Sequence, residues 1–435
     1  MMSLSNQNKP KSKFSARRLL KALALTTVMG VVACAPPQSN YKPTGEGVVD
    51  VMVPYGSGGG TDTWARFITQ AFADINPDVR RYQVVNVPGG ETITGTNAFV
   101  KSGVTNGQYV MVGSATTYFQ DMLDHKAVQF DFAKMEPLAF NGTGGVVWTN
   151  GNKTGIKNIN DLKNAKEEWL YGGMSASGLD LIALLALEAL GVPNRGVFGF
   201  EGRGPTRLAV LRGETALDFQ TTSTYLSQLA DNVKTGEVVP LFSMGIPVNG
   251  KIERDPNLPD IPTFEELYQQ IGGKTDHQRK AYQAFQAFVA TGLYYQKGLW
   301  ANEGTDPAVI DKYDAMVKQL NADEAFMKKA KEALGGYQLI SGKEAKADFN
   351  KALKVDPETM DFIAKLLLEK YGTAIHQEKS NDGYNYFCFR TACRSDSTVV
   401  FVGRCGDWDH HWCYPGIGRY RCCSRIDAFY LYVGA

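Results

Sequence analysis

The sequence predicts an α/β fold with mostly parallel β-sheets, and three observations support this. The segment 48–53 is apolar and β-branched, and a glycine-rich turn and a helical pattern follow it directly. Short apolar runs then alternate with helical runs as far as residue 221. The chain has 435 residues, 43% of them hydrophobic and 21% charged, which is ordinary for a globular protein of two or three domains.

The expected elements follow in chain order from hydrophobic pattern and glycine stops. The run 179–190 is strongly apolar and ends at Gly191, and the helical pattern 203–212 ends at Gly213, as glycine often ends a helix. A further helix begins at 159. The expected strands are 84–87, 109–112, 145–149, 169–172 and 216–219.

The glycine-rich turn, residues 56–60, is a candidate anion cradle. A helix that starts after such a turn points backbone N–H groups into a cleft, where a carboxylate or phosphate fits. We expect Thr61 or Asp62 to cap this helix. The turn lacks the Gly-Lys-Ser/Thr ending of a nucleotide P-loop, and Thr61 stands where a dinucleotide fingerprint needs its last glycine. The alternative is a tight turn that binds nothing.

Small hydroxyl residues follow four separate expected strands. Parallel strands bring such loops to one edge of a sheet, so these neutral donors are expected to surround an anionic ligand. The alternative is that serine and threonine are simply common in loops. The residues are Ser57, Thr61, Ser114, Thr116, Thr117, Ser175, Ser177, Thr221, Thr222 and Ser223.

The N-terminus predicts export. Residues 1–33 carry six basic and no acidic side chains, and the apolar run 22–33 ends in Val-Val-Ala before Cys34, which is typical of a lipobox. We therefore expect a lipoprotein signal peptide over 1–33, a lipid on Cys34, a tether over 34–47 and a periplasmic or cell-surface location. The alternative is an ordinary N-terminal membrane anchor. Without the signal, the formal charge changes from +1 to 1 − 6 = −5, which disfavours nucleic acid as a partner.

Nothing in the sequence predicts an enzyme. The five histidines do not accompany a nucleophile motif, and no Gly-x-Ser-x-Gly elbow occurs. Asp62 and Asp218 form a conceivable carboxylate pair, but Asp62 fits a capping role better. We expect no catalytic residues, no metal and no cofactor.

Six segments together resemble one family. The chain resembles the periplasmic substrate-binding receptors of tripartite tricarboxylate transporters, also called Bug-type receptors, from about Val48 to about Leu353. The segments that carry the resemblance are 53–66, 85–90, 106–114, 202–205, 258–263 and 299–307, in the order that the family has them.

The resemblance implies a two-domain periplasmic-binding-protein fold, of the type II-like Venus-flytrap class. Domain 1 would comprise 48–146 and 267–375, and domain 2 would comprise 147–266. Such a receptor closes on a small carboxylate and delivers it to the subunits of a membrane transporter. Combined with the hydroxyl pattern, the predicted ligand-binding residues are Tyr55, Ser57, Gly58, Gly59, Gly60, Thr61, Asp62, Ser114, Ala115, Thr116, Ser175, Ala176, Ser177, Thr221 and Thr222.

The chain departs from the family at positions that matter for charge. Val87 stands where a basic residue is usual, the segment 89–92 replaces a Gly-Ala-Gly-Gly run, and Glu201 stands where a lysine is usual. The case for a tri-anionic ligand such as citrate is therefore weaker. A mono- or dicarboxylate is at least as good a candidate, with any aromatic part met by Tyr55, Trp64 or Phe200.

The C-terminal residues differ from the rest. No cysteine lies between Cys34 and Cys388, whereas six follow within 384–435, after a polar linker over 376–383. An even set in an exported chain predicts three disulfides in a small antiparallel β module. The spacing weakly resembles defensin-like and sea-anemone-toxin-like folds. The alternatives are a zinc site at Cys405, His410, His411 and Cys413, and a chain whose activity is an adhesive or toxin-like contact with a surface partner. The six cysteines are Cys388, Cys393, Cys405, Cys413, Cys422 and Cys423.

Overall fold

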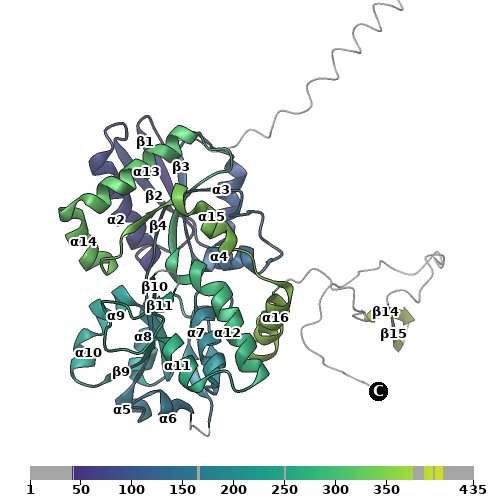
Figure 1. Ribbon diagram of the computed structural model, residues 1–435. Helices are drawn as coiled ribbons and strands as arrows, with labels where there is room; N and C mark the ends of the chain where they lie inside the picture. Colours follow the sequence, from purple (N-terminus) through teal and green to yellow (C-terminus); the bar gives the residue numbers. More distant parts are fainter. Residues whose placement is uncertain are drawn as a thin grey trace, which may run out of the picture. The chain divides into compact units, whose positions relative to one another are not determined.

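The computed structural model describes Lys42, residues 44–163, 167–248 and 251–375, and the two strands 387–394 and 397–404. The chain divides into two compact units between residues 376 and 377. The first unit, here called the body, contains two lobes, each built around its own β-sheet (Figure 1). Cys34 and the predicted signal peptide and lipobox lie outside the described residues.

The first lobe contains a six-stranded sheet in the order β13-β4-β12-β3-β1-β2. Strand β1 runs parallel to β2 and β3, whereas β12 runs antiparallel to β3 and β4, and β13 antiparallel to β4. The strands are β1 (Val48–Val53), β2 (Arg81–Asn86), β3 (Tyr109–Ser114), β4 (Glu136–Asn141), β12 (Lys297–Ala301) and β13 (Leu339–Ser341).

The second lobe contains a five-stranded sheet in the order β7-β6-β8-β5-β9. Strand β6 is parallel to β7 and β8, whereas β5 is antiparallel to β8 and β9. The strands are β5 (Gly145–Asn150), β6 (Trp169–Gly172), β7 (Asn194–Val197), β8 (Leu217–Thr221) and β9 (Val238–Ser243), and a hairpin of β10 (Ile246–Val248) and β11 (Lys251–Glu253) follows them.

The expectation of mostly parallel sheets is wrong. Strands β4 and β5 are separated by residues 142–144 only, yet they belong to different sheets. Strand β12 brings the chain back into the first sheet after a long excursion. Of these strands, β12 and β5 enter their sheets antiparallel to the β-α-β part, and no local sequence pattern encodes that direction.

The predicted strands and helices are otherwise confirmed. The helix expected over 179–190 is α7, which is buried along its whole length and packs on α11 and α12. The helix expected over 203–212 is α8. The helices of the body are α2 (Gly60–Ile75), α3 (Ile93–Ser102), α4 (Ala115–Met122), α5 (Gly151–Thr154), α6 (Ile159–Lys163), α7 (Asp180–Leu190), α8 (Arg203–Arg212), α9 (Thr222–Gln228), α10 (Ala230–Lys234), α11 (Phe264–Ile271), α12 (Asp276–Val289), α13 (Pro307–Ala322), α14 (Glu324–Leu334), α15 (Gly342–Ala352) and α16 (Pro357–Tyr371), with the single turns η1 (Gly90–Thr92) and η2 (Ala290–Tyr294).

Helix packing bears on the predicted domain boundaries. Helix α12 packs on α7 of the second lobe, and α16 packs on α12 (Figure 1). Both helices belong to the range 267–375, which the sequence assigned to the first domain. The predicted boundary at residue 266 falls inside α11 (Phe264–Ile271), and both α11 and α12 pack on α7 before the chain re-enters the first sheet at β12. The domain bounds themselves stay a prediction.

Two apolar cores cover the two faces of the first sheet. One face packs on α2, α13 and α14 through side chains such as Val51, Trp64 and Leu299. The other face contributes Met52, Met111 and Trp300 to a core that continues into the second lobe. Because strand side chains alternate between faces, every second residue of β1, β3 and β12 belongs to the same core.

The second unit is described only through two strands. Strands β14 (Phe387–Arg394) and β15 (Ser397–Arg404) pair antiparallel, with Phe387 opposite Arg404 and Arg394 opposite Ser397. The predicted disulfides and the alternative zinc site depend on side chains outside the described residues, so both stay predictions.

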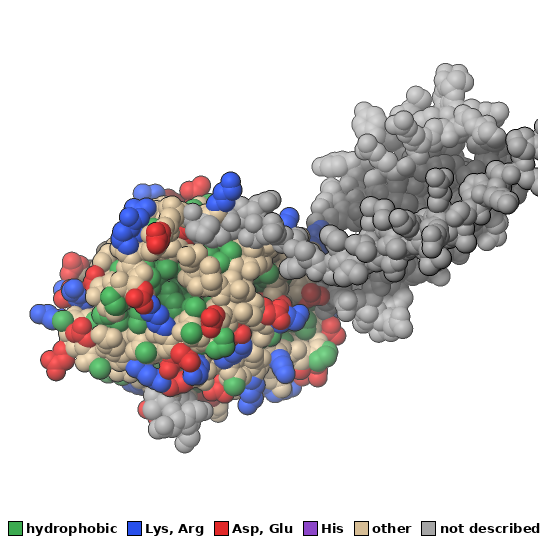
Figure 2. Space-filling model, turned by 90° about the horizontal axis from the view of Figure 1, so that it is seen from above, with side chains coloured by type: hydrophobic (Ala, Val, Ile, Leu, Met, Phe, Trp, Pro, Cys, Tyr) green, Lys and Arg blue, Asp and Glu red, His purple; other side chains and the backbone are tan. Residues whose placement is uncertain are grey.

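Two further features of the described residues concern the distribution of surface charge and the length of the apolar helices. Acidic and basic side chains are interspersed over the face of the body seen in Figure 2, without a broad area of one sign. Within the described ranges, no helix combines the length and apolarity needed to cross a membrane.

Candidate functional site

The glycine-rich loop joins β1 to α2 at the end of the first sheet. Its residues 56–60 are exposed, and Gly58 adopts a left-handed φ of 79°, a conformation that glycine reaches without strain. The N-cap is Gly59 and no side chain caps the helix, so the expectation that Thr61 or Asp62 would do so is wrong. The first N–H groups of α2 therefore have no side-chain acceptor at the cap.

The buried carboxylate of Asp62 holds the glycine-rich loop through hydrogen bonds. This carboxylate is only 2% exposed and accepts hydrogen bonds from the Gly58 N–H at 2.8 Å, Asn86 Nδ2 at 2.9 Å and Arg66 Nε at 3.0 Å. Burial opposes ionisation, but these hydrogen bonds outweigh it and lower the pKa of Asp62. Both the Asp62 carboxylate and the Gly58 N–H are thus used within the loop itself.

Tyr55 and Ser114 meet beside this loop. The Tyr55 hydroxyl lies 2.5 Å from Ser114 Oγ and 2.9 Å from Thr117 Oγ1. Burial raises the pKa of Tyr55, so this hydroxyl keeps its proton at neutral pH. The N–H of Ala115 donates to the carbonyl of Gln296 at 3.0 Å, which ties the start of α4 to the chain just before β12.

The second lobe contributes a loop with two serines, residues 173–179. Asp180, which is 1% exposed, accepts hydrogen bonds from the N–H groups of Met174 and Ser175 at 2.9 and 3.3 Å. Arg203 Nη1 lies 2.6 Å from the other oxygen of the same carboxylate. The Asp180–Arg203 pair therefore holds the serine loop from behind, a role that the sequence did not reveal.

The two lobes touch through this serine loop. The Leu179 N–H donates to Thr116 Oγ1 across the lobes at 3.3 Å. The hydroxyls of Ser175 and Ser177 lie 2.9 Å apart and each donates, also at 2.9 Å, to one oxygen of Glu91. The same Glu91 oxygen accepts from Gln120 Nε2 at 3.1 Å. A carboxylate of the first lobe thus binds the two predicted hydroxyls of the second.

Glu91 was not among the predicted site residues. Its backbone is left-handed, with φ 50°, and that of Thr92 is left-handed as well, with φ 84°. Non-glycine residues rarely adopt this region, and such strain concentrates at functional positions. The sequence did contain one indication of Glu91: segment 89–92 replaces a Gly-Ala-Gly-Gly run, so Glu91 stands among positions that hold small residues in the family.

The last predicted pair lies deeper, near the crossing strands. Thr222 is fully buried and donates to Asp255 Oδ2 at 2.9 Å, and Tyr337 donates to the same oxygen. Thr221 contacts Thr224 at 3.1 Å. Neither threonine has a described hydrogen bond to the serine loop or to Tyr55, so the structure does not bring them to the other predicted residues.

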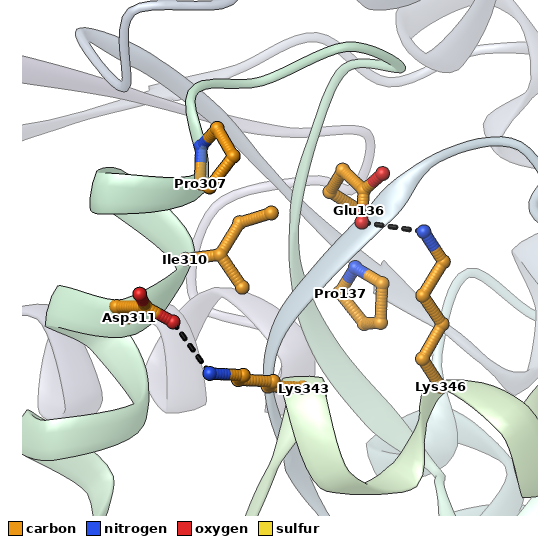
Figure 3. Close-up of a pocket in the computed structure, with 7 residues that line it drawn as sticks. All are labelled: Glu136, Pro137, Pro307, Ile310, Asp311, Lys343 and Lys346. Atoms are coloured by element: carbon orange, nitrogen blue, oxygen red, sulfur yellow. Dashed lines mark hydrogen bonds and ion pairs between the residues drawn. The ribbon is translucent and has the colours of Figure 1, made fainter.

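A separate hollow of about 300 Å³ lies between α13, α15 and the start of β4 (Figure 3). Its two lysines are already paired, Lys343 with Asp311 at 2.6 Å and Lys346 with Glu136 at 2.5 Å. Glu136 begins β4, whereas Asn141, which accepts a hydrogen bond from Trp64 of α2, ends it. This hollow includes none of the predicted ligand-binding residues.

The described side chains form no group of three or more His, Cys, Asp or Glu that would hold a metal ion. The groups that converge between the lobes are hydroxyls, amides and one carboxylate. Such a set can hydrogen-bond a polar ligand.

Comparisons with known proteins give a fold. No protein-family model matches the sequence, and no curated protein matches it. The periplasmic binding protein BugD is 18% identical with a TM-score of 0.53, and the match covers 75% of this chain and 98% of BugD. MatC from Rhodopseudomonas palustris, solved with malate, is 18% identical with a TM-score of 0.53, over 73% and 98%. Another R. palustris protein, solved with adipate, is 16% identical with a TM-score of 0.54, over 72% and 96%.

The body has the fold of these binding proteins. The predicted two-lobed α/β architecture is thereby confirmed, and so is the resemblance to Bug-type receptors as a likeness of fold. At these identities the likeness does not extend to a ligand, which has to be argued from the site.

Proposed function

We propose that the body is a solute-binding receptor that captures a small mono- or dicarboxylate between its lobes. The observation that carries this proposal is the pair Ser175 and Ser177, whose hydroxyls already bind a carboxylate, that of Glu91. Hydroxyls that hold a glutamate carboxylate at 2.9 Å suit the carboxylate of a ligand equally well. The proteins of the same fold solved with malate and adipate make small carboxylates the natural class to test.

Capture works by hinge closure in this proposal. Residues 142–144 join β4 to β5, and the chain returns to the first sheet at β12, so the chain crosses between the two sheets at these points. A ligand carboxylate takes the place of Glu91 on the serines and contacts the first lobe near Tyr55 and Ser114. The closed form is stabilised by ligand contacts that exist only when both lobes are near.

The surroundings of the receptor belong to the same proposal. The lipobox at Cys34 would anchor the body outside the cytoplasmic membrane, and a tripartite tricarboxylate-type transporter would receive the ligand. Radiolabelling with a fatty acid tests the anchor, since a Cys34→Ala chain should then lose the label. The receptor itself performs no chemistry.

A thermal-shift screen with mono-, di- and tricarboxylates tests the binding proposal. Saturable stabilisation by mono- or dicarboxylates, with the ligand recovered unchanged by mass spectrometry, supports a receptor. No stabilisation by any carboxylate contradicts it, and formation of a product would replace it with an enzyme.

A further inference from the structure

Lys297, the first residue of β12, lies in a row of polar residues across the first sheet. It pairs in register with Ser114 of β3 on one side and with Asn141 of β4 on the other. Ser114 in turn contacts Tyr55, which follows β1. The row Asn141, Lys297, Ser114, Tyr55 therefore runs along the end of the sheet where the glycine-rich loop begins.

The alternation of side chains along β12 shows on which face of the sheet Lys297 lies. Leu299 and Ala301, two and four residues after Lys297, belong to the core that packs on α2. Asn141 accepts a hydrogen bond from Trp64 Nε1 of α2 at 3.2 Å. Lys297 thus lies on the α2 face, at the end of that face where the glycine-rich loop enters the helix.

Lys297 has no counter-ion there. In the part of the chain that the structure describes, its ammonium makes neither a hydrogen bond nor an ion pair, although the side chain is partly buried. Burial without a partner lowers the pKa of Lys297 to about 8. A buried lysine that remains unpaired is costly, and an anion beside it removes much of that cost.

Two arginines beside the glycine-rich and serine loops already have partners. Arg203 is bound to Asp180, and Arg66 to Asp62, through the contacts described above. The position of Val87 is neutral and that of Glu201 is acidic. Lys297 is then the candidate for the positive charge that those two positions lack.

We propose that Lys297 supplies the positive charge that binds one carboxylate of a dicarboxylate ligand on the first lobe. The inference rests on the proposed function and names the residue that selects an anionic ligand. It also places the anion between Ser114 and Asn141, at the glycine-rich loop. The second carboxylate of a dicarboxylate would then reach the serines of the second lobe.

The proposal predicts that the affinity for a carboxylate depends on pH through the titration of Lys297 alone. Three titratable groups lie on the elements packed beside Lys297: Tyr55, Asp62 and Tyr337. Burial raises the pKa of Tyr55 and of Tyr337, which is bound to Asp255, whereas the pKa of Asp62, which is paired with Arg66, is lowered. All three pKa values are therefore shifted away from pH 8. The affinity for a carboxylate should be steady below pH 8 and fall above it, as Lys297 loses its proton.

Titration calorimetry with malate and with adipate tests the assignment on the full chain. Lys297→Met should weaken binding by about tenfold or more, because a charge-assisted contact is lost, whereas Lys297→Arg should retain most of it. Lys329→Met, a matched change at an exposed position of α14, should bind as the unchanged protein does. The Lys297→Met chain should also lose the fall in affinity above pH 8.

The outcomes separate the two proposals. If the unchanged protein binds either probe and Lys297→Met binds equally well with the same pH profile, the assignment of Lys297 is overturned and the receptor stands. If the unchanged protein binds no carboxylate, both the receptor and the assignment fail.

Discussion

Removal of the Glu91 carboxylate should make the receptor bind its ligand more tightly. Glu91 occupies the hydroxyls of Ser175 and Ser177, to which a ligand carboxylate would bind. In the proposed function, the ligand has to displace Glu91 before the lobes close on it. The form in which Glu91 is hydrogen-bonded to the two serines therefore competes with the ligand-bound form. The more stable this form is, the weaker the apparent affinity for the ligand.

The magnitude follows from three hydrogen bonds. Glu91 accepts from Ser175, Ser177 and Gln120 at 2.9, 2.9 and 3.1 Å, at a residue that is itself exposed. At an exposed position each such bond contributes about 0.5 kcal/mol, the low end of the usual range, and so about 1.5 kcal/mol together. That corresponds to roughly a tenfold gain in affinity for Glu91→Ala.

Calorimetric titration with malate and adipate measures this gain. Glu332→Ala, which removes a carboxylate from an exposed position on α14, is the matched control and should leave the affinity unchanged. In a chain that already carries Ser175→Ala and Ser177→Ala, the additional Glu91→Ala change should have little effect, because the shared partners are gone. An affinity that stays the same or falls in a folded Glu91→Ala chain would refute the competition between Glu91 and the ligand.

Three further predictions concern stability. Asp180→Asn removes the carboxylate charge that the partly buried Arg203 contacts and should cost about 3 kcal/mol in urea unfolding, whereas a loss below about 1 kcal/mol would speak against the pair as the support of the serine loop. Burial opposes ionisation of Glu188, but hydrogen bonds and nearby cations outweigh it and lower its pKa from 4.5 to about 2. The ionised Glu188 therefore contributes roughly 3 kcal/mol to the free energy of unfolding above pH 4.5, and this contribution is lost as the pH falls through 2. The thermal stability of Glu188→Gln should lack this acid dependence, and an unchanged acid profile would contradict the contribution of Glu188. Burial lowers the pKa of Lys297 from 10.5 to about 8, so ligand-free protein should gain stability as the pH rises from 8 to 10.5. Lys297→Met should be more stable than the unchanged protein at pH 7, by up to about 3 kcal/mol, and equal to it by pH 10.5; a less stable variant at pH 7 would contradict the unpaired charge.

Local patterns were enough to predict several elements of the body, all of them before residue 222. The apolar helix α7 and the strand, glycine turn and helix of β1 and α2 depend on near neighbours in the sequence, through periodicity and glycine stops. The directions of β5 and β12 depend instead on where the chain crosses between lobes. No short segment carries that information, which explains why the parallel expectation failed.

The site divides in the same way. Ser175 and Ser177 could be named as candidates because a hydroxyl after a strand has a local signature, and their role as ligand-binding residues stays a prediction. Glu91 was missed because its two serine partners lie far away in the chain, at sequence separations of 84 and 86. Lys297 was missed because only the register of β12 against β3 and β4 brings it beside Ser114.

The central claim is that the two serines of the second lobe bind a ligand carboxylate. A crystal structure of the full chain with the carboxylate that stabilises it most in the thermal-shift screen tests this directly. The account predicts a carboxylate oxygen of the ligand within about 2.6–3.2 Å of both Ser175 Oγ and Ser177 Oγ, with Glu91 displaced from them. A ligand bound elsewhere, with Glu91 still held by both serines, would contradict it.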